Sequence, residues 1–343
     1  MRTFTFMTAP LLASAAMFIT TLSVPSASGT TLNGMVQTGD TCSTQPLPHV
    51  QVRLFEATTG QPTVIGQATT DAFGHFSISS PNNMSSSIFY VSADVGEHVE
   101  FLTVLGTRLP ATVTINELTT VAASYSMAQF YKTDVISGNS FSLQIAAGMN
   151  DNLVTPVTGG SSFVLLSSPN ADETNSLRST RSLANLLAAC VHDGSVTSTF
   201  LDLAKPPRGP APRTTAQALA DLTRNPWQDV DAIYALTTLS DAYEPALERM
   251  PDAWTVSVKV NDTGDDAHLF AGLGNLTFDS RGYAWITNNT NQGTPFSGHF
   301  MVVLKPNGRP SDGTNGTPVS PVRGEAFWAG VMGSPSTHRA QYG

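Results

Sequence analysis

The spacing of apolar residues changes twice along this 343-residue chain, and these changes limit the folds it can adopt. Apolar and polar residues alternate over 30–107, apolar residues recur at helical spacing from about 113 to 250, and alternation returns over 251–310. A period of two is typical of half-buried strands, and a period of 3.6 is typical of helices. We therefore expect a mixed, multi-domain fold with a β-module, a helical segment and a second β-module.

The first β-module, residues 29–107, has the pattern of a β-sandwich. Short alternating runs occur at Val50–Phe55, Gly74–Ile78 and Ile88–Ser92, and turn residues separate them. Runs of this length and spacing are typical of two packed sheets. In the turn before the second run, Asp71 is expected to accept backbone N–H groups and Gly74 to take a positive φ.

Two stretches of this module, Pro46–Val52 and Ala68–Phe76, resemble carboxypeptidase-regulatory-like and Cna-B-like sandwich domains. In those domains a T-D-x-x-G-x-F turn links two strands. The resemblance covers roughly 75 residues and implies a spacer, stalk or binding module rather than a catalyst. A carbohydrate-binding or adhesive sandwich is an alternative, with Phe73 and Tyr90 as candidate contacts, although the apolar neighbours of Tyr90 favour core packing. His75 is expected on the surface.

Residues 108–250 are expected to form a helical linker domain. Asn116 has the character of an N-cap, and Glu117 would lie at the positive end of that helix dipole. Thr214 is expected to cap a later helix that ends at Arg224, before a proline. The other expected helices are Ser140–Leu153, Asn175–His192 and Val230–Leu239.

The stretches Ile115–Ala122 and Leu183–Val191 resemble a linker cassette of secreted bacterial proteins that carry NHL-type or streptogramin-lyase-like propellers. That resemblance implies a second cysteine soon after Cys190, where this chain has Ser198-Thr199-Phe200. The other cysteine, Cys42, lies in a different module, so we expect the two to be unpaired or differently partnered. Neither has His or Cys neighbours at the spacing of a metal site.

The second β-module, residues 251–310, resembles one blade of an NHL or streptogramin-lyase-like propeller. Expected strands are Trp254–Val260, a hairpin over Leu276–Asn289, and Phe300–Leu304, closed by Pro306-Asn307-Gly308. The resemblance lies in the pattern apolar-x-apolar-D-x-x-G-x-x-W-apolar-x-N. In it Asp279 and Gly282 shape a tight turn, Trp285 fills the core between blades, and Asn288 ends the strand with local backbone bonds.

A single blade cannot close a propeller, which typically needs about 4 to 8, and residues 311–343 read as irregular. Read one frame over, the codons of Glu325–Gly343 can encode I-A-I-D-P-Q-G-T-I-W, which matches the blade pattern. We therefore expect a C-terminally truncated propeller with a frame-shifted tail. The alternative is a divergent tail; further blade repeats downstream in the shifted frame would distinguish the two.

The N-terminus indicates export. Arg2 precedes an apolar stretch, Phe6–Val24, which small residues follow. Pro10 and several hydroxyl residues interrupt the stretch, which favours a signal peptide over 1–28, cleaved near Ala27 or Ser28, rather than a membrane anchor. No later stretch is apolar and long enough to cross a bilayer, so a secreted, periplasmic or cell-surface location is expected.

Composition and motifs exclude several functions. The net charge is −9 without a basic run, which disfavours nucleic acid as a partner. The seven histidines form no metal-binding pair, and no nucleophile elbow or phosphate-binding loop occurs. Asn261–Asp266 is rich in hard oxygen ligands for calcium, but it lacks EF-hand spacing and is better read as a solvated loop. Asn275 and Asn288 lie in glycosylation triplets.

These observations predict no catalytic, cofactor or metal residue, because the lyase site of the resembling family would lie in blades that this sequence lacks. The favoured function is an exported, non-enzymatic binding or scaffold protein of unknown ligand. Its partner would be an extracellular protein or a polysaccharide. The alternatives are a remnant of a propeller lyase or hydrolase without its catalytic blades, and the carbohydrate-binding sandwich.

Overall fold

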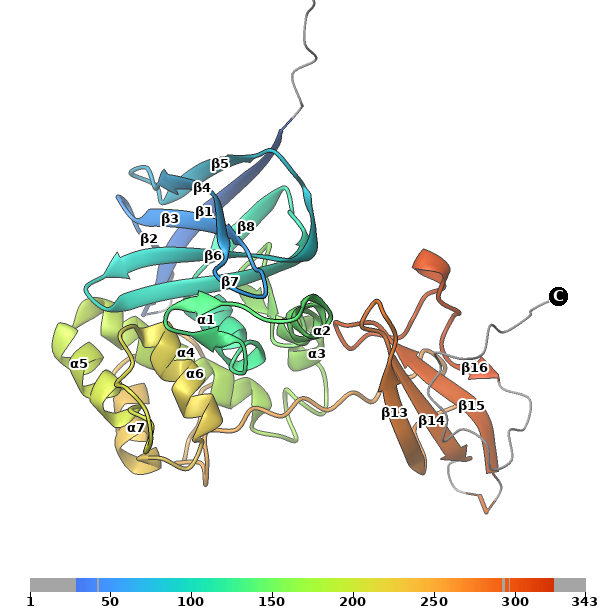
Figure 1. Cartoon of the computed structure of the whole chain (residues 1–343). Coiled ribbons are helices and arrows are strands. Elements are labelled where there is room, and N and C mark those ends of the chain that lie inside the picture. Colours follow the sequence, from blue (N-terminus) through green and yellow to red (C-terminus); the bar gives the residue numbers. More distant parts are fainter. Residues whose placement is uncertain (1–28, 42, 292–293, 296, 324–343) are drawn as a thin grey trace, which may run out of the picture.

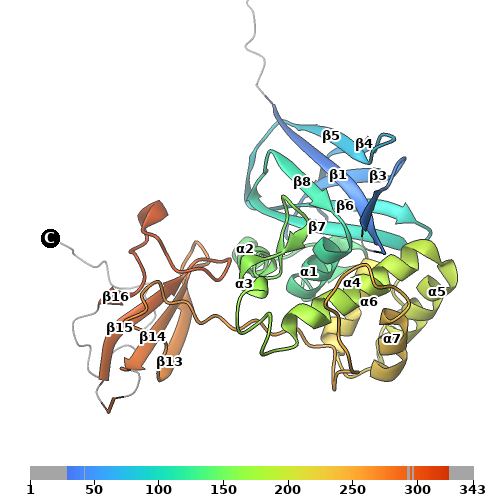
Figure 2. The same cartoon turned by 180° about the vertical axis from the view of Figure 1, so that it is seen from behind.

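The computed structural model describes residues 29–41, 43–291, 294–295 and 297–323. In chain order it has an N-terminal pair of mainly antiparallel sheets, a helical middle segment, and a C-terminal antiparallel sheet of four strands (Figure 1). The expected mixed architecture is confirmed at this level. The C-terminal sheet lies to one side of the other two parts, and an irregular segment after the last helix leads to it (Figure 2).

Eight strands form the N-terminal pair of sheets. One sheet has the order β2-β1-β5, with β8 pairing in parallel along β1, and the other has the order β4-β3-β6-β7. The strands are β1 (Thr30–Asp40), β2 (Ser43–Pro46), β3 (Gln51–Glu56), β4 (Thr63–Thr69), β5 (His75–Ser80), β6 (Met84–Gly96), β7 (Val99–Arg108) and β8 (Thr112–Ile115).

The apolar alternation explains the core between these sheets. In β5, Phe76 and Ile78 are buried and their neighbours are exposed, as a strand with one buried face requires. The turn before β5 is as predicted. The Oδ1 atom of Asp71 accepts the N–H groups of Phe73 and His75, and Gly74 has a φ of 76°.

The strands β6 and β7 are buried on both faces over most of their length, and the buried positions include polar residues such as Ser92 and Thr103. Phe89 and Phe101 belong to the core between the sheets. Ile88, Tyr90 and Leu102 point the other way and pack against the helices. The helical segment therefore covers the outer face of the β6–β7 pair, beneath the sheets in Figure 1.

Seven helices and two short hairpins make up the middle segment. Asn116 caps the first helix and Thr214 the sixth, as the sequence predicts. The sequence did not predict α3, α5 or the two-stranded hairpins. Helix α3 and the hairpin strands are too short to show a periodicity of their own, and α5 begins directly after Asp193, where α4 ends. The elements are α1 (Glu117–Ser126), β9 (Tyr131–Lys132), β10 (Val135–Ile136), α2 (Ser140–Asn150), β11 (Val154–Thr155), β12 (Gly160–Ser161), α3 (Phe163–Leu166), α4 (Ser176–His192), α5 (Gly194–Leu203), α6 (Thr215–Arg224) and α7 (Val230–Thr237).

Helix α1 is the centre of the middle segment, and Glu117 at its start is fully buried. Its Oε1 atom accepts the hydroxyl of Thr38 and, at 3.1 Å, the N–H of Gly39, both in β1. Its Oε2 atom accepts the hydroxyl of Tyr243 at 2.6 Å, from the segment after α7. One carboxylate thus joins a sheet, a helix and the chain that leaves the helices.

Residues 254–260 are extended but do not form the expected strand. Their backbone bonds to side chains of the helical segment instead of a neighbouring strand. The hydroxyl of Ser176 donates to the carbonyl of Ser257, and the amide of Asn170 bonds both the N–H and the carbonyl of Lys259. The alternation in this segment therefore reflects one buried side and not membership of a sheet.

The C-terminal sheet is a meander in the order β13-β14-β15-β16. Its first turn repeats the Asp71 turn. The Oδ1 atom of Asp279 accepts the N–H groups two and four residues on, and Gly282 has a φ of 79°. The sequence placed the end of this module at residue 310, whereas pairing with β15 continues to Arg323. The strands are β13 (Leu273–Phe278), β14 (Ala284–Thr290), β15 (Ser297–Leu304) and β16 (Val322–Arg323).

The expected local role of Asn288 differs from the structure. Its Oδ1 atom accepts the N–H of Ala271, and its amide donates to the carbonyl of Leu269. These bonds tie β14 to the chain that enters the sheet, 17 and 19 residues earlier. Trp285 is half-buried, and its indole N–H donates to the Oδ2 atom of Asp279 at 3.3 Å.

Replacing Glu117 by Ala is expected to lower the free energy of unfolding by about 3–5 kcal/mol, because two buried donors and one partly buried donor lose their acceptor. Tyr243→Phe removes one of these bonds and is expected to cost about 1–2 kcal/mol. Urea denaturation measures both changes. Glu97→Ala is the control, because that side chain is 93% exposed; an equal loss of stability in the control and in Glu117→Ala would contradict the assignment.

A second buried acid, Glu100 in β7, makes stability depend on pH. The hydroxyl of Tyr131 donates to its Oε2 atom at 2.7 Å, and no cation pairs with it among the described residues. Burial raises the pKa of Glu100 to about 7, from 4.5, although the bond from Tyr131 opposes the change. The folded protein therefore keeps a proton that the unfolded chain releases at lower pH.

Because the folded pKa is the higher one, the stabilising effect is present below pH 4.5 and is lost as pH rises towards 7. We expect the free energy of unfolding to fall by about 3 kcal/mol over this range through Glu100 alone. Glu100→Gln, which stays neutral, is expected to remove this part of the pH dependence. Urea denaturation at several pH values tests it, and parallel curves for the two proteins would refute it.

Candidate functional site

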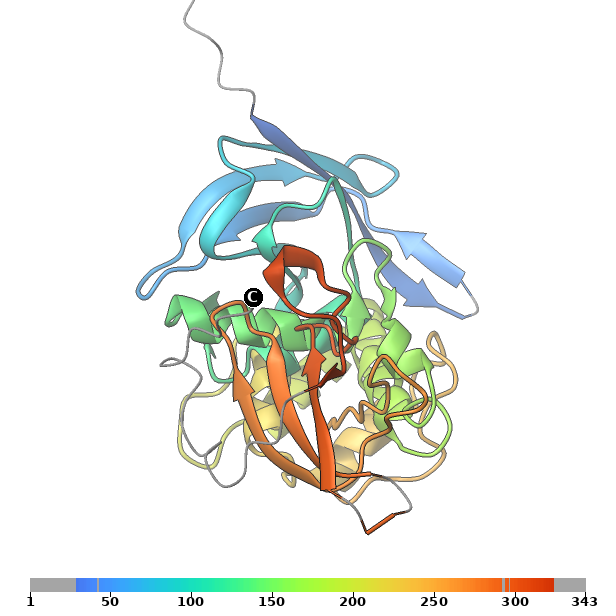
Figure 3. The same cartoon turned by 90° about the vertical axis from the view of Figure 1, so that its right-hand side faces the viewer.

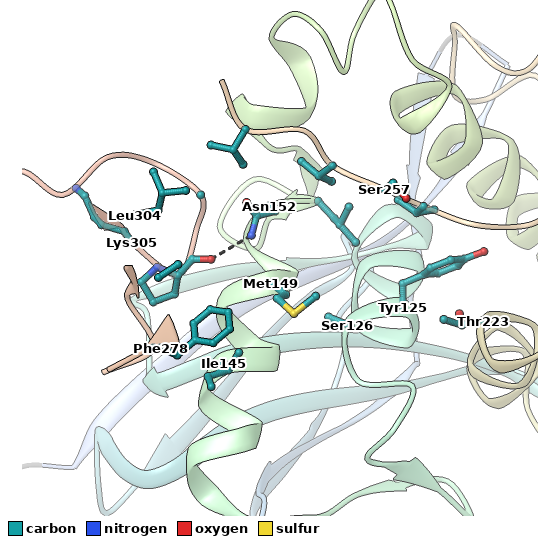
Figure 4. A pocket seen from close by; sticks show the side chains of 18 of the residues that line it. Tyr125, Ser126, Ile145, Met149, Asn152, Thr223, Ser257, Phe278, Leu304 and Lys305 are labelled. Atoms are coloured by element: carbon teal, nitrogen blue, oxygen red, sulfur yellow. Dashed lines mark hydrogen bonds between the residues drawn. The ribbon is translucent and has the colours of Figure 1, made fainter. Parts of the chain in front are cut away.

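The candidate site is an apolar cavity of about 540 Å³ between the helical segment and the C-terminal sheet, called here the junction cavity. Figure 4 shows side chains from both parts around it. Helices α1 and α2 contribute Tyr125, Ser126, Ile145 and Met149. The turn ends of the C-terminal strands supply the opposite wall, and Figure 3 shows this sheet in front of the helices. Its residues are Phe278, Gly282, Ala284 and Leu304.

The extended segment 254–260 forms a third wall. Trp254, Val256, Val258 and Val260 occupy every second position and line the cavity. Val256 and Val258 also pack on an apolar cluster with Leu153. The side-chain hydrogen bonds of this segment fix its backbone, and so they hold the wall in place.

Two close contacts set the distance between the two sides of the cavity. The amide of Asn152, just after α2, donates to the carbonyl of Pro306 at 3.0 Å, the dashed line in Figure 4. Gly148 in α2 lies against the ring of the same proline. A Cβ at position 148 would lie 2.1 Å from the Cβ of Pro306, so only glycine permits this approach. The turn that follows β15 therefore docks directly on the end of α2.

Several polar groups of the cavity are used in internal bonds. The hydroxyl of Tyr125 donates to the carbonyl of Trp254 at 2.9 Å, and burial raises the pKa of Tyr125. The hydroxyl of Thr223 donates within its own helix, and the Lys305 ammonium pairs with Asp312 at 2.6 Å. Thr255 and Ser257 are exposed, whereas the indole N–H of Trp254 is buried and has no acceptor among the described residues.

The sequence singled out none of the side chains on the helices of this cavity. Tyr125 and Met149 lie on different helices and come together only through packing, which no local pattern encodes. The one usable signal was the alternation from Trp254 to Val260, whose buried side faces the cavity.

The oxygen-rich loop considered for calcium uses its carboxylates to cap turns. The Oδ1 atom of Asp262 accepts the N–H of Gly264, and that of Asp265 accepts the N–H of Ala267. The Oδ2 atom of Asp265 lies 2.6 Å from the Nδ1 atom of His268. Within the described ranges, no three His, Cys, Asp or Glu side chains gather where they could hold a metal ion.

The other singled-out residues are spread over the molecule. Tyr90 is 1% exposed and belongs to the core, as expected, whereas Phe73 is 69% exposed in its turn. His75 lies on the surface, as predicted. Cys190 is a buried free thiol, and burial raises its pKa to about 12. Cys42 lies outside the described residues, as do the predicted signal peptide and the tail beyond Arg323.

Two of the glycosylation triplets, at Asn288 and Asn275, differ in access. The side chain of Asn288 is buried, and both its amide atoms are hydrogen-bonded, so the folded protein does not present it to an enzyme. Asn275 lies on the exposed strand β13.

Comparisons with known proteins leave the family open. No protein-family model matches this sequence, and no curated protein matches it. Among solved structures, one match is a 9R-lipoxygenase from Cyanothece PCC8801, at 13% sequence identity and a TM-score of 0.19. It covers 65% of this chain and 28% of the lipoxygenase chain, and at that TM-score it carries no argument about fold or activity.

No helix in the part of the chain that the structure describes is both long enough and apolar enough to span a membrane.

Asn152→Ala is expected to loosen the contact between α2 and the turn after β15, because it removes the bond to Pro306, worth about 1 kcal/mol. Hydrogen exchange should become faster at residues 305–309 and stay unchanged in β3 and β6. Gln144→Ala is the matched control, because Gln144 lies in α2 and its amide donates to the carbonyl of Ser86 instead. Equal exchange at 305–309 in both variants would contradict a docking role for Asn152.

Proposed function

We propose that this protein is an exported, non-enzymatic binding protein whose ligand is a small, mainly apolar molecule held in the junction cavity. The observation that carries the proposal is the cavity itself, formed by apolar side chains from three separate parts of the chain. Its volume lies within the range of ordinary ligand sites, about 300–1,000 Å³.

The chemistry of the walls favours binding over catalysis. The hydroxyls of Tyr125 and Thr223 already donate to backbone carbonyls, and Lys305 is paired with Asp312. A nucleophile next to a general base, which hydrolysis or acyl transfer needs, is not among the described lining residues. We therefore propose that the lining residues bind a ligand without converting it.

The indole N–H of Trp254 narrows the ligand class. An unpartnered buried donor costs about 1–3 kcal/mol, and an acceptor oxygen on the ligand would remove that cost. We therefore expect an apolar ligand with one neutral acceptor, such as the carbonyl of an ester or ketone. A charged carboxylate is disfavoured, because no free cation lines the described walls to offset its desolvation.

The finer fold is part of the same proposal: the N-terminal sheets form a carboxypeptidase-regulatory-like sandwich, and the C-terminal sheet is the first blade of an NHL- or streptogramin-lyase-like propeller. Support comes from the sequential antiparallel order of β13 to β16 and from the turn at Asp279. Leu273, Leu276 and Phe278 on the edge strand β13 are 58%, 56% and 40% exposed. An exposed apolar edge of this kind is what a neighbouring blade would cover.

The binding test uses the fluorescent apolar probe N-phenyl-1-naphthylamine and its displacement by methyl decanoate. Met149→Arg places a charge in the cavity wall. It is expected to lower the affinity for both ligands by about tenfold or more, because the charge resists desolvation. Met84→Arg is the matched control, since the two methionines are 54% and 51% exposed and only Met149 lines the cavity. Absence of displacement, or equal affinity in the two variants, would count against the proposal.

A further inference from the structure

A second cleft, of about 650 Å³, lies beside helix α6 and shares no lining residue with the junction cavity. Three pieces of chain enclose it: the tip of the β9–β10 hairpin, the proline-rich loop between α5 and α6, and one face of α6. We call it the α6 cleft. Its lining residues are Lys132, Thr133, Pro206, Pro207, Arg208, Gly209, Pro210, Gln217, Asp221, Arg224 and Asn225.

The walls of the α6 cleft are held by hydrogen bonds. The guanidinium of Arg224 donates to the carbonyls of Ala128 and Tyr131, which fixes the chain that leads into the hairpin. The amide of Gln228 donates to the carbonyls of Leu203 and Lys205, at the start of the proline-rich loop. The cleft is therefore a built feature of the fold and not a gap between loose loops.

Two residues that line the cleft each have a buried acceptor atom without a donor. Gln217 is 7% exposed and Asp221 is 5% exposed, and both belong to α6 four residues apart, on one face. The Oε1 atom of Gln217 and the Oδ2 atom of Asp221 have no hydrogen-bond partner among the described residues. The other oxygen of Asp221 accepts from Arg224 at 2.5 Å. Buried acceptors in this state favour a ligand that brings hydroxyl or N–H donors.

The rim of the α6 cleft has the opposite character. Lys132 and Arg208 are exposed, and within the described residues neither forms an ion pair. Two free cations on a chain of net charge −9 favour an anionic group at the mouth. In the same cleft, Pro206, Pro207 and Pro210 offer apolar ring surfaces without N–H groups.

We propose that the α6 cleft binds a uronic acid residue, as a free sugar or within an acidic polysaccharide. Its ring hydroxyls donate to Gln217 and Asp221, its carboxylate meets Lys132 and Arg208, and its C–H face packs on the prolines. A neutral sugar lacks the group that the rim cations attract. A simple carboxylate lacks the donors that Gln217 and Asp221 need.

Titration calorimetry with digalacturonate, supported by saturation-transfer NMR with D-glucuronate, tests the proposal on the full chain. Binding is expected for both, with D-glucose and acetate weaker by about tenfold or more, since each offers only half of the recognised groups. The double variant Lys132→Gln/Arg208→Gln, at the exposed rim, is expected to lower the affinity for digalacturonate by a similar factor. Gln217→Met keeps the length of the side chain and should lower the affinities for glucose and glucuronate alike.

Arg108→Gln is the control, because Arg108 is an exposed cation at the end of β7 that does not line the α6 cleft. Circular dichroism and the melting temperature establish that each variant is folded. Failure of digalacturonate to bind the wild-type protein would overturn the proposal. So would acetate binding as tightly as glucuronate, or a rim variant that binds like Arg108→Gln. None of these results bears on the junction cavity, which has its own probe and variants.

Discussion

The buried carboxylate of Glu117 is the constraint on which most of this structure depends. It accepts hydrogen bonds from β1 on one side and from the segment after α7 on the other, so the first sheet and the exit from the helices are fixed to the same residue. Burial raises the pKa of Glu117, and the hydrogen bonds from Thr38, Tyr243 and Gly39 oppose this change. A charge without those donors would be too costly to bury. The position of α1, and with it one wall of the junction cavity, follows from satisfying this one group.

Side-chain hydrogen bonds to the backbone fix the segment that leads to the C-terminal sheet. The segment that leads to it is extended, yet side chains such as Asn170 and Ser176 bond its backbone where a neighbouring strand would normally do so. A strand ladder would have closed this segment into a sheet and filled the space beside it. Side-chain bonds leave its apolar side facing α1 and α2, and the contact of Pro306 with Gly148 sets the remaining distance. The segment is thus held without being paired, and its apolar side lines the cavity.

Local features of the fold were predictable from the sequence because short-range chemistry determines them. The turns at Asp71 and Asp279 each need an aspartate acceptor and a glycine with positive φ, and both motifs gave the right turn. The caps at Asn116 and Thr214 are of the same kind. The strand expected over 254–260 was wrong because alternation reports a buried side and not a paired edge. Neither pocket was predictable, since their walls come from elements far apart in the sequence.

The proposed first blade and the junction cavity involve different parts of the C-terminal sheet. The cavity lies at the turn ends of the strands, beside Ala284 and Leu304, whereas the exposed edge runs along β13. A neighbouring sheet packed on Leu273 and Leu276 would cover the edge and leave the turn at Pro306 docked on α2. Phe278 alone belongs to both regions. Ligand binding and growth of the sheet can therefore coexist, because the docking contacts lie at the turn after β15 and a further strand would add along β13.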